Sequence, residues 1–207
     1  MDEKELKILG KDKDYWWFKA KDELIKKEIF ENLKTSAKIL NVGPGVFPLH
    51  YAENYYGDVC KLPYEDEFFD IVIMADVLEH IYNREDALYH IRRVLKNGGK
   101  LILTVPAHQW LYNKHDIFLE HFLRYGKKQL KDEIEYNGFE TIKLRYWNSI
   151  LFPLLVLWKL FLSKNESDFR KLPKFLNWIL YKILKTEEIV TLPWGISLFG
   201  VFQKNDV

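Results

Sequence analysis

The sequence of 207 residues is poor in features that mark several protein classes. Its single cysteine, Cys60, allows neither an intramolecular disulfide nor a cysteine metal cluster, which suits the reducing cytoplasm. The formal net charge is only +1, so no overall field attracts nucleic acid. Residues 1–13 are rich in charged side chains, unlike a secretory signal. We therefore expect a cytoplasmic protein that does not bind nucleic acid.

Long hydrophobic runs are also scarce. The longest, ILFPLLVLWKLFL at 150–162, contains Pro153 and Lys159. As a helix it would rise about 1.5 Å per residue, roughly 20 Å in all, and the hydrocarbon core of a bilayer is ~30 Å thick. This segment is therefore expected to be a buried or membrane-surface helix rather than a spanning one.

Apolar runs with strand character alternate with stretches of helical spacing. Strands are predicted over 38–42, 69–75, 100–105, 139–146 and 196–203. Helices are predicted over 15–33, 84–95, 127–136 and most of 149–190, with a polar break at 163–168. This order predicts one α/β domain over 1–207 with a doubly wound, mostly parallel sheet. Residues 1–35 would form a helical cap, and 149–190 an apolar helical insertion before the last strand.

A glycine turn follows the first predicted strand directly. Gly43 and Gly45 lack a Cβ and would let the backbone approach a nucleotide-like ligand. Such turns also serve purely structural roles, so the pair alone does not decide between the two readings. No third glycine completes the dinucleotide fingerprint, which disfavours an oxidoreductase with a nucleotide cofactor.

Four motifs in order resemble those of class I S-adenosylmethionine-dependent methyltransferases. ILNVGPG at 39–45 is similar to "LD-x-G-x-G-x-G", and GDVCKLPY at 57–64 with FFDIV at 68–72 to "GDA-x-x-LPF…FD-x-V". DVLEH at 76–80 and RVLKNGG at 93–99 resemble "DVLEH" and "RVLKPGG". YWWF at 15–18, HD at 115–116, His121 and RY at 124–125 resemble a bacterial and archaeal branch with "WWF-x-x-R" and "HD…GH-x-RRY".

The resemblance implies a Rossmann-like, seven-stranded sheet with S-adenosylmethionine at the carboxyl ends of the first strands. The glycines would meet the methionine moiety and ribose, and Asp58 the adenine or ribose. His80 would brace its loop or face the substrate. For each of these residues the alternative is packing at a strand end. The implied cofactor contacts are Asn41, Gly43, Pro44, Gly45, Asp58, Val59, Ala75, Asp76 and His80.

Three departures from the family pattern concern the cofactor-binding half. Phe47 stands at the third glycine and Asn41 at the first-strand acid. The interval 46–57 is too short for the family's helix, second strand, helix and third strand, so residues 55–58 must serve as the second strand or the third. Losing one charged hydrogen bond to ribose costs about 1.5–3 kcal/mol, roughly ten- to a hundredfold in affinity. Weak cofactor binding is therefore expected.

The segment 108–125 holds the candidates for a catalytic base. Methyl transfer from a sulfonium needs in-line positioning and a proton acceptor, and a histidine beside a carboxylate suits that role. A capped, hydrogen-bonded surface loop is the structural alternative. No metal site is expected, because the segment offers too few ligands. The catalytic candidates are His115, Asp116, His121 and Tyr125.

Aromatic and apolar side chains flanked by lysines fill the insertion 149–190. This composition suits a membrane surface, and packing on the sheet or on a second copy of the chain explains it equally well. The sequence thus predicts methyl transfer to a small-molecule or lipid-linked, amphipathic acceptor, with a membrane surface or a homodimer as partner. The alternative is a non-catalytic relative with an eroded cofactor site that acts as an interaction module.

Overall fold

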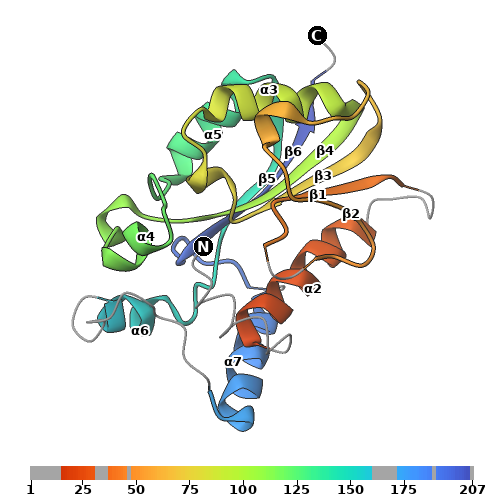
Figure 1. Cartoon of the computed structure of the whole chain (residues 1–207). Helices are drawn as coiled ribbons and strands as arrows, with labels where there is room; N and C mark the ends of the chain where they lie inside the picture. The colour runs from red at the N-terminus through yellow and green to blue at the C-terminus, as the bar shows by residue number, and fades with distance from the viewer. Residues whose placement is uncertain (1–14, 31–36, 46–47, 160–171, 188–189, 206–207) are drawn as a thin grey trace.

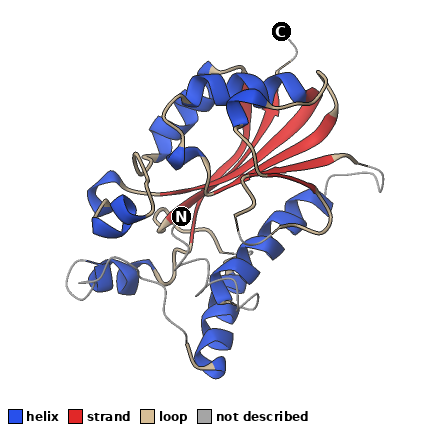
Figure 2. Ribbon diagram, viewed as in Figure 1, coloured by secondary structure: helices blue, strands red, loops and turns tan. Residues whose placement is uncertain are grey.

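The computed structural model describes residues 15–30, 37–45, 48–159, 172–187 and 190–205. A single twisted sheet lies between helices on both of its faces (Figures 1 and 2). Its strands, listed along the chain, are β1 (Ile39–Val42), β2 (Glu53–Tyr55), β3 (Phe69–Ala75), β4 (Leu95–Pro106), β5 (Phe139–Trp147) and β6 (Ser197–Lys204).

The strand order is β2-β1-β3-β4-β6-β5. The pairs β1–β2, β1–β3 and β3–β4 are parallel, whereas β6 runs antiparallel to both β4 and β5. The predicted doubly wound, mostly parallel sheet with an antiparallel end is thereby confirmed. All strands except β6 point their carboxyl ends to the same edge, which we call the carboxyl edge.

The number of strands departs from the seven that the resemblance implied. The described residues form six strands, and β2 pairs directly with β1 in the register Asn41 to Asn54. Parallel neighbours normally need a crossover of roughly a dozen or more residues, usually a helix. Residues 43–52 alone connect β1 to β2, so a helix and a further strand have no room there. Residues 55–58 were expected to serve as the second or third strand, and β2, which ends at Tyr55, takes the place beside β1.

Helices α3 (Arg84–Val94) and α5 (Lys127–Tyr136) cover one face of the sheet (Figure 1). Leu88 and Ile91 of α3 and Leu130 and Ile134 of α5 are fully buried in one hydrophobic cluster with the strands. Their spacing of three or four residues puts them on one side of each helix. Asn83 begins α3, because its side chain accepts a hydrogen bond from the Asp86 backbone N–H.

Helices α2 (Trp16–Phe30) and α7 (Lys174–Thr186) cover the opposite face (Figure 1). Leu24, Ile25 and Ile29 of α2 and Leu184 of α7 are buried in the second hydrophobic cluster. Between the two helices, the Tyr181 hydroxyl donates to Glu23 at 2.7 Å. The cap predicted at the N-terminus is therefore a helix packed on the sheet over its described residues.

Most predicted boundaries agree with the structure, and α5 matches exactly. The helix predicted over 84–95 ends at Val94, and β4 starts at Leu95, earlier than predicted. The glycines expected to end that helix lie inside β4, where Gly98 has a φ of 70°. A Cβ on Gly99 would lie 2.8 Å from the Lys96 carbonyl, so this irregular stretch of strand needs glycine.

The insertion 149–190 contains α6 (Phe152–Leu157) and α7 within its described residues. The predicted polar break at 163–168, Phe47 and the end of the first predicted helix at 31–33 lie outside the residues described. Within the described chain, every helix is too short or too polar to cross a membrane.

Candidate active site

Left-handed residues follow four strands at the carboxyl edge. Gly43 after β1 has a φ of 62°, Asp76 after β3 55°, His108 after β4 66° and Asn148 after β5 55°. A positive φ costs a non-glycine residue of order 1–3 kcal/mol and concentrates at functional sites. Ligands of open α/β sheets bind outside the carboxyl ends of the strands. This edge is therefore the candidate active site.

The glycine turn brings two strand ends into contact. The Gly43 N–H donates to the Tyr55 carbonyl at 3.0 Å, which ties the end of β1 to the end of β2. A Cβ on Gly43 would lie 2.9 Å from the Val77 side chain in the turn after β3. Gly45 is also left-handed, with a φ of 57°, and Pro44 between the two glycines is half-buried. Gly43 is thus required by the close approach of Val77.

Asn41, the residue at the position of the family's acid, is buried and engaged within the protein. Its Nδ2 donates to Asn54 Oδ1 at 2.9 Å. Asn54 in turn accepts from the Leu49 N–H at 2.9 Å and donates to the carbonyls of Leu49 and Ala52. This network holds the connection between β1 and β2 and occupies the amide of Asn41 that was predicted to contact the cofactor.

Asp58 and Val59 lie beyond β2, at the 3₁₀ turn Val59–Lys61. Asp58 caps this turn, with its Oδ1 accepting from the Cys60 N–H at 3.0 Å, and its side chain is 56% exposed. Val59 is 6% exposed and belongs to the cluster under α3. Asp58 therefore keeps one accessible oxygen, whereas the side chain of Val59 serves the core.

Asp76 forms the charged centre of the carboxyl edge. It pairs with Lys21 of α2, which is 7% exposed, and accepts from Thr104 Oγ1 at 2.7 Å. Burial raises the pKa of Asp76, but the charge of Lys21 and the hydrogen bonds from Lys21 and Thr104 outweigh it, so the pKa lies below its usual value. Ala75 beneath it is half-buried.

Lys21 was missing from the predicted site. The signal for it was its place three residues after Phe18, where the branch pattern "WWF-x-x-R" has a basic residue. Its Nζ also lies 5.6 Å from the ring centres of Trp17 and Phe18.

His80 lies in the 3₁₀ turn Leu78–His80 that follows β3. Its ring centre is 4.6 Å from that of His121. Burial, followed by the neighbouring His121, lowers the pKa of His80 to about 4, so the ring is neutral at pH 7. The adjacent Glu79 is fully buried, and burial followed by the charge of Asp76 raises its pKa well above the usual value. Glu79 was also missing from the predicted site.

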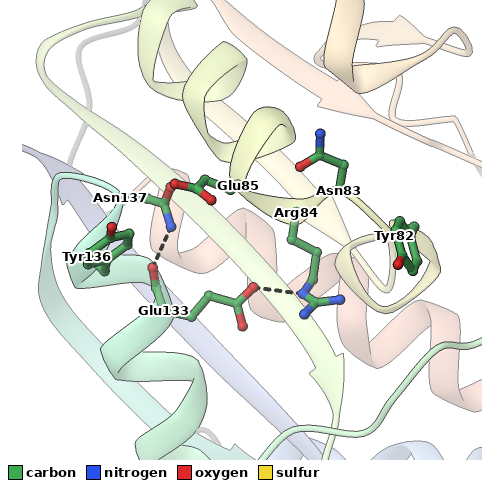
Figure 3. Close-up of a pocket in the computed structure, with 7 residues that line it drawn as sticks. All are labelled: Tyr82, Asn83, Arg84, Glu85, Glu133, Tyr136 and Asn137. Carbon is green, nitrogen blue, oxygen red and sulfur yellow. Dashed lines mark hydrogen bonds and ion pairs between the residues drawn. The ribbon is translucent and has the colours of Figure 1, made fainter.

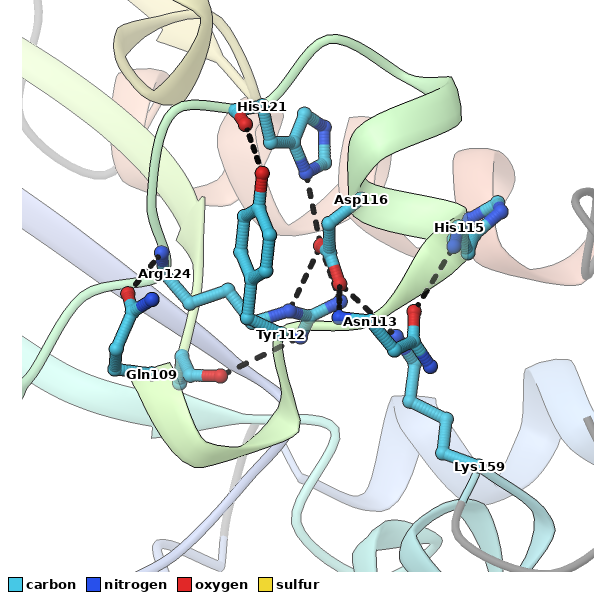
Figure 4. Close-up of polar contacts among 9 residues, drawn as sticks. Gln109, Tyr112, Asn113, His115, Asp116, His121, Arg124 and Lys159 are labelled. Carbon is cyan, nitrogen blue, oxygen red and sulfur yellow. Dashed lines mark hydrogen bonds and ion pairs between the residues drawn. The ribbon is translucent and has the colours of Figure 1, made fainter.

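Asp116 organises the segment after β4 (Figure 4). Its fully buried carboxylate accepts from Arg124 Nε at 2.8 Å and from the Asn113 N–H at 3.0 Å, and lies 3.0 Å from His121 Nδ1. Lys159 Nζ lies 3.7 Å away. Burial raises the pKa of Asp116, but these partners together lower it well below the usual range. Asp116 therefore acts here as a charged anchor for the loop.

The remaining catalytic candidates separate in space. His115 is buried in the short helix α4 (Lys114–Phe118), and its N–H donates to Asn113 Oδ1 at 3.1 Å. Tyr125 is fully buried in the cluster under α3 and α5, and burial raises the pKa of its hydroxyl. The structure thus brings Asp116, His121 and His80 together and places Tyr125 in the core instead of on the loop surface.

Two surface depressions lie away from these residues. One, of about 280 Å³, lies between the start of α3 and the end of α5, where Arg84 Nε donates to Glu133 at 2.8 Å (Figure 3). The other, of about 520 Å³, is lined by Lys127, Lys128 and Lys131 and two residues of β5. Neither includes a predicted site residue.

The carboxyl edge fits the two ends of S-adenosylmethionine unequally. At the methionine end, the left-handed glycines allow close backbone approach, and Lys21 and Asp76, which pair with each other, would have to exchange partners to meet a carboxylate and an ammonium. At the nucleoside end, β2 carries Asn54, whose side chain is already engaged with Asn41, Leu49 and Ala52. The one acid of β2, Glu53, stands at the start of the strand, and the carboxyl end of the strand, where the acid that would bind ribose hydroxyls is expected, is Tyr55.

Comparison with known proteins gives a family match over the first half of the chain. Residues 16–103, which run from α2 into β4, match the family model described as "Methyltransferase domain". This segment includes Lys21, the glycine turn, Asp76, Glu79 and His80. Over this segment, less than half of the chain, the sequence is similar to methyltransferase domains, and the Rossmann-like fold is like that of solved methyltransferase structures.

Individual relatives agree over part of their length. "Uncharacterized protein MJ0638" of Methanocaldococcus jannaschii is 40% identical over 95 residues, which are 46% of this chain and 40% of that protein. "Ubiquinone/menaquinone biosynthesis C-methyltransferase UbiE" of Stutzerimonas stutzeri is 36% identical over 64 residues, 30% of this chain and 25% of that one. The matched segments therefore span well under half of these relatives.

Among solved structures, Haemonchus contortus phosphoethanolamine N-methyltransferase 2 in complex with S-adenosyl-L-methionine superposes with a TM-score of 0.57. It is 17% identical and covers 90% of this chain and 52% of that one. At this identity the likeness concerns the fold alone. The narrower branch suggested by the motifs outside 16–103 stays a prediction.

Proposed function

We propose that the chain transfers a methyl group from S-adenosylmethionine to an amphipathic acceptor at a membrane surface. The observation that carries methyl transfer is the methyltransferase domain match, because residues 16–103 build most of the carboxyl edge. Lys21 and Asp76 support binding of the methionine end of the cofactor, since their charges are opposite to its carboxylate and ammonium.

The acceptor side would be the segment after β4. Methyl transfer from a sulfonium needs little beyond in-line positioning and a proton acceptor. His121, held by the Asp116 carboxylate, and the neutral His80 beside it are the groups suited to take a proton. His115, buried in α4, supports the loop that carries them.

An amphipathic acceptor is supported by the apolar outer surface of α6 and α7. Leu154 and Leu157 of α6 are 63% and 54% exposed, and Phe175 and Trp178 of α7 are 68% and 59% exposed. Lys182 Nζ lies 5.7 Å from the Trp178 ring centre. Aromatic side chains interleaved with lysines suit the interface of an anionic bilayer.

Calorimetric titration with S-adenosylmethionine tests the first part. We expect binding weaker than about 10 µM, because a missing charged hydrogen bond to ribose costs roughly ten- to a hundredfold. Submicromolar binding would show that another group holds the ribose. Undetectable binding at millimolar ligand would favour the non-catalytic alternative, in which the chain is an interaction module.

Cosedimentation with vesicles tests the second part. The chain should cosediment with vesicles that contain anionic lipids. Added salt should release part of it, because salt screens the attraction between the lysines and the lipid headgroups. Trp178→Ser should weaken binding, whereas Trp110→Ser, a matched change of a 58% exposed tryptophan outside α6 and α7, should not. A dimer in light scattering that ignores vesicles would assign the surface to a second copy. A monomer that ignores vesicles would reject both partners.

A further inference from the structure

Three potential metal ligands meet at the carboxyl edge, from two segments far apart in sequence. One ligand atom each of Glu79, His80 and His121 lie within 4.8 Å of one another. The two segments are joined by a hydrogen bond of 2.8 Å from the Phe122 N–H to the Glu79 carbonyl. His115, Asp116 and His121 alone offer too few ligands, so this set emerges only when the turn after β3 packs on the loop after β4.

Glu79 is the independent reason to expect a ligand there. It is 0% exposed, and neither carboxyl oxygen accepts a hydrogen bond from another residue in the described chain. A buried polar group without such a partner is destabilising, and a charged one more so. A cation between Glu79 and the two imidazoles would satisfy this carboxylate.

His121 is oriented in the way that metal-binding histidines usually are. Its Nδ1 lies 3.0 Å from Asp116 Oδ1, which leaves Nε2 for an ion. Its backbone is fixed as well, because the Tyr112 hydroxyl donates to the His121 carbonyl at 2.6 Å (Figure 4). A carboxylate bonded to the second ring nitrogen fixes the tautomer and strengthens the ligand.

We propose that Glu79, His80 and His121 bind a divalent transition metal ion such as Zn²⁺, Fe²⁺ or Co²⁺. Two imidazoles and one carboxylate are the donor set that these ions take, with a fourth position left open. Ligands about 2.0–2.1 Å from a tetrahedral ion lie roughly 3.4 Å apart, so the side chains must close slightly around it. The ion would stand beside the Lys21–Asp76 pair, on the side of the edge assigned above to the acceptor, and with the ion bound His80 and His121 would act as ligands in place of the proton acceptors proposed for the metal-free site.

Titration of the chelator-treated chain with CoCl₂ tests this site without cofactor or acceptor, so its result is independent of methyl transfer. Co²⁺ held by nitrogen and oxygen ligands absorbs visible light. We expect one ion per chain, displacement by ZnCl₂, and a rise in thermal midpoint with ZnCl₂. Absence of binding to both ions at millimolar concentration would overturn the proposal.

Two variants test the ligands Glu79 and His80, and a third is the control. Glu79→Gln keeps the side-chain volume, and His80→Ala removes a half-buried ring. Each should weaken Co²⁺ binding roughly a hundredfold or more, because losing a ligand costs more than the ~10–100-fold lost with a residue that only hydrogen-bonds to a ligand. His50→Ala, a change of an exposed histidine in the connection 48–52, should bind Co²⁺ like the parent. Circular dichroism checks that each variant is folded. Parent-like binding by folded Glu79→Gln and His80→Ala would refute the site.

Discussion

Replacing Asp116 with asparagine should destabilise the chain strongly, although Asp116 lies in a loop. Its carboxylate is fully buried and meets Arg124 Nε and Nη2, both at 2.8 Å. Arg124 itself is 4% exposed, and its backbone N–H is held by Gln109. The guanidinium of Arg124 therefore cannot reach solvent when the carboxylate is removed.

The magnitude follows from that burial. Removing one partner of a buried ion pair costs about 3–5 kcal/mol, because the other charge is left uncompensated. In a chain of this size each kcal/mol lowers the melting temperature by about 2–4 °C, so we expect a fall of roughly 6–20 °C. The amide nitrogen of asparagine replaces one of the two acceptor oxygens, so either the Asn113 N–H or the Oδ1 partners His121 and Arg124 also lose an acceptor.

Urea unfolding followed by tryptophan fluorescence and by circular dichroism measures this change. Asp66→Asn is the matched control, because Asp66 also pairs with an arginine, Arg93, at 2.7 Å, but its side chain is 72% exposed. Exposed pairs contribute about 0–1 kcal/mol, so the control should unfold almost like the parent. A folded Asp116→Asn variant that is as stable as Asp66→Asn would refute the view of Asp116 as the anchor of the loop.

Three further predictions concern charge. Lys21→Met should lower affinity for S-adenosylmethionine about tenfold or more in calorimetry, and unchanged affinity would make the residue structural. Burial and, after it, the negative charge of Asp58 raise the pKa of the Cys60 thiol to about 11. Iodoacetamide should therefore alkylate Cys60 slowly at pH 8 and much faster near pH 11. A pH dependence like that of a free thiol, with a pKa near 8.5, would contradict this. Burial raises the pKa of Glu23, but Lys185 and Tyr181 lower it by more, so the pKa lies below the usual ~4.3. The stability that the charged Glu23 adds is therefore present above that pH and is lost in acid. The difference in unfolding free energy between the parent and Glu23→Gln, measured by urea unfolding over a range of pH, should shrink as the pH falls.

The sheet and its helices were predictable because their signals are local. The apolar run of β3 and the spacing of Leu88 and Ile91 in α3 each lie within one element. The glycines at 98 and 99 misled the prediction, since the same residues end helices and allow irregular strands. Asn97 to Gly99 lie in β4 between Leu95 and Lys100, the two residues that pair with β3 at this end of the strand.

The clustering of the candidate residues was predictable in outline, and their pairings were not. Histidines and a carboxylate after β4 marked a candidate segment, but the sequence alone does not distinguish the anchor Asp116 from a catalytic group. Lys21 and Asp76 lie 55 positions apart, and a single sequence does not indicate that two such distant residues are in contact. Glu79 lies inside the DVLEH motif, and the sequence does not show that its carboxyl group is buried without a hydrogen-bond partner from another described residue.

The short connection between β1 and β2 separates stability from cofactor affinity. Both faces of the sheet stay covered, by α3 and α5 on one side and α2 and α7 on the other, so the hydrophobic clusters do not depend on the missing crossover. The nucleoside end of the site does depend on it, since the ribose acid of the family belongs to that interval. Asn54, which lies in β2 beside β1, instead uses its side chain for hydrogen bonds to Leu49 in the connection between the two strands. A chain shortened here can therefore keep a well-packed sheet, and under the proposed function Lys21 and Asp76, at the other end of the site, would contribute most of the binding energy for the cofactor.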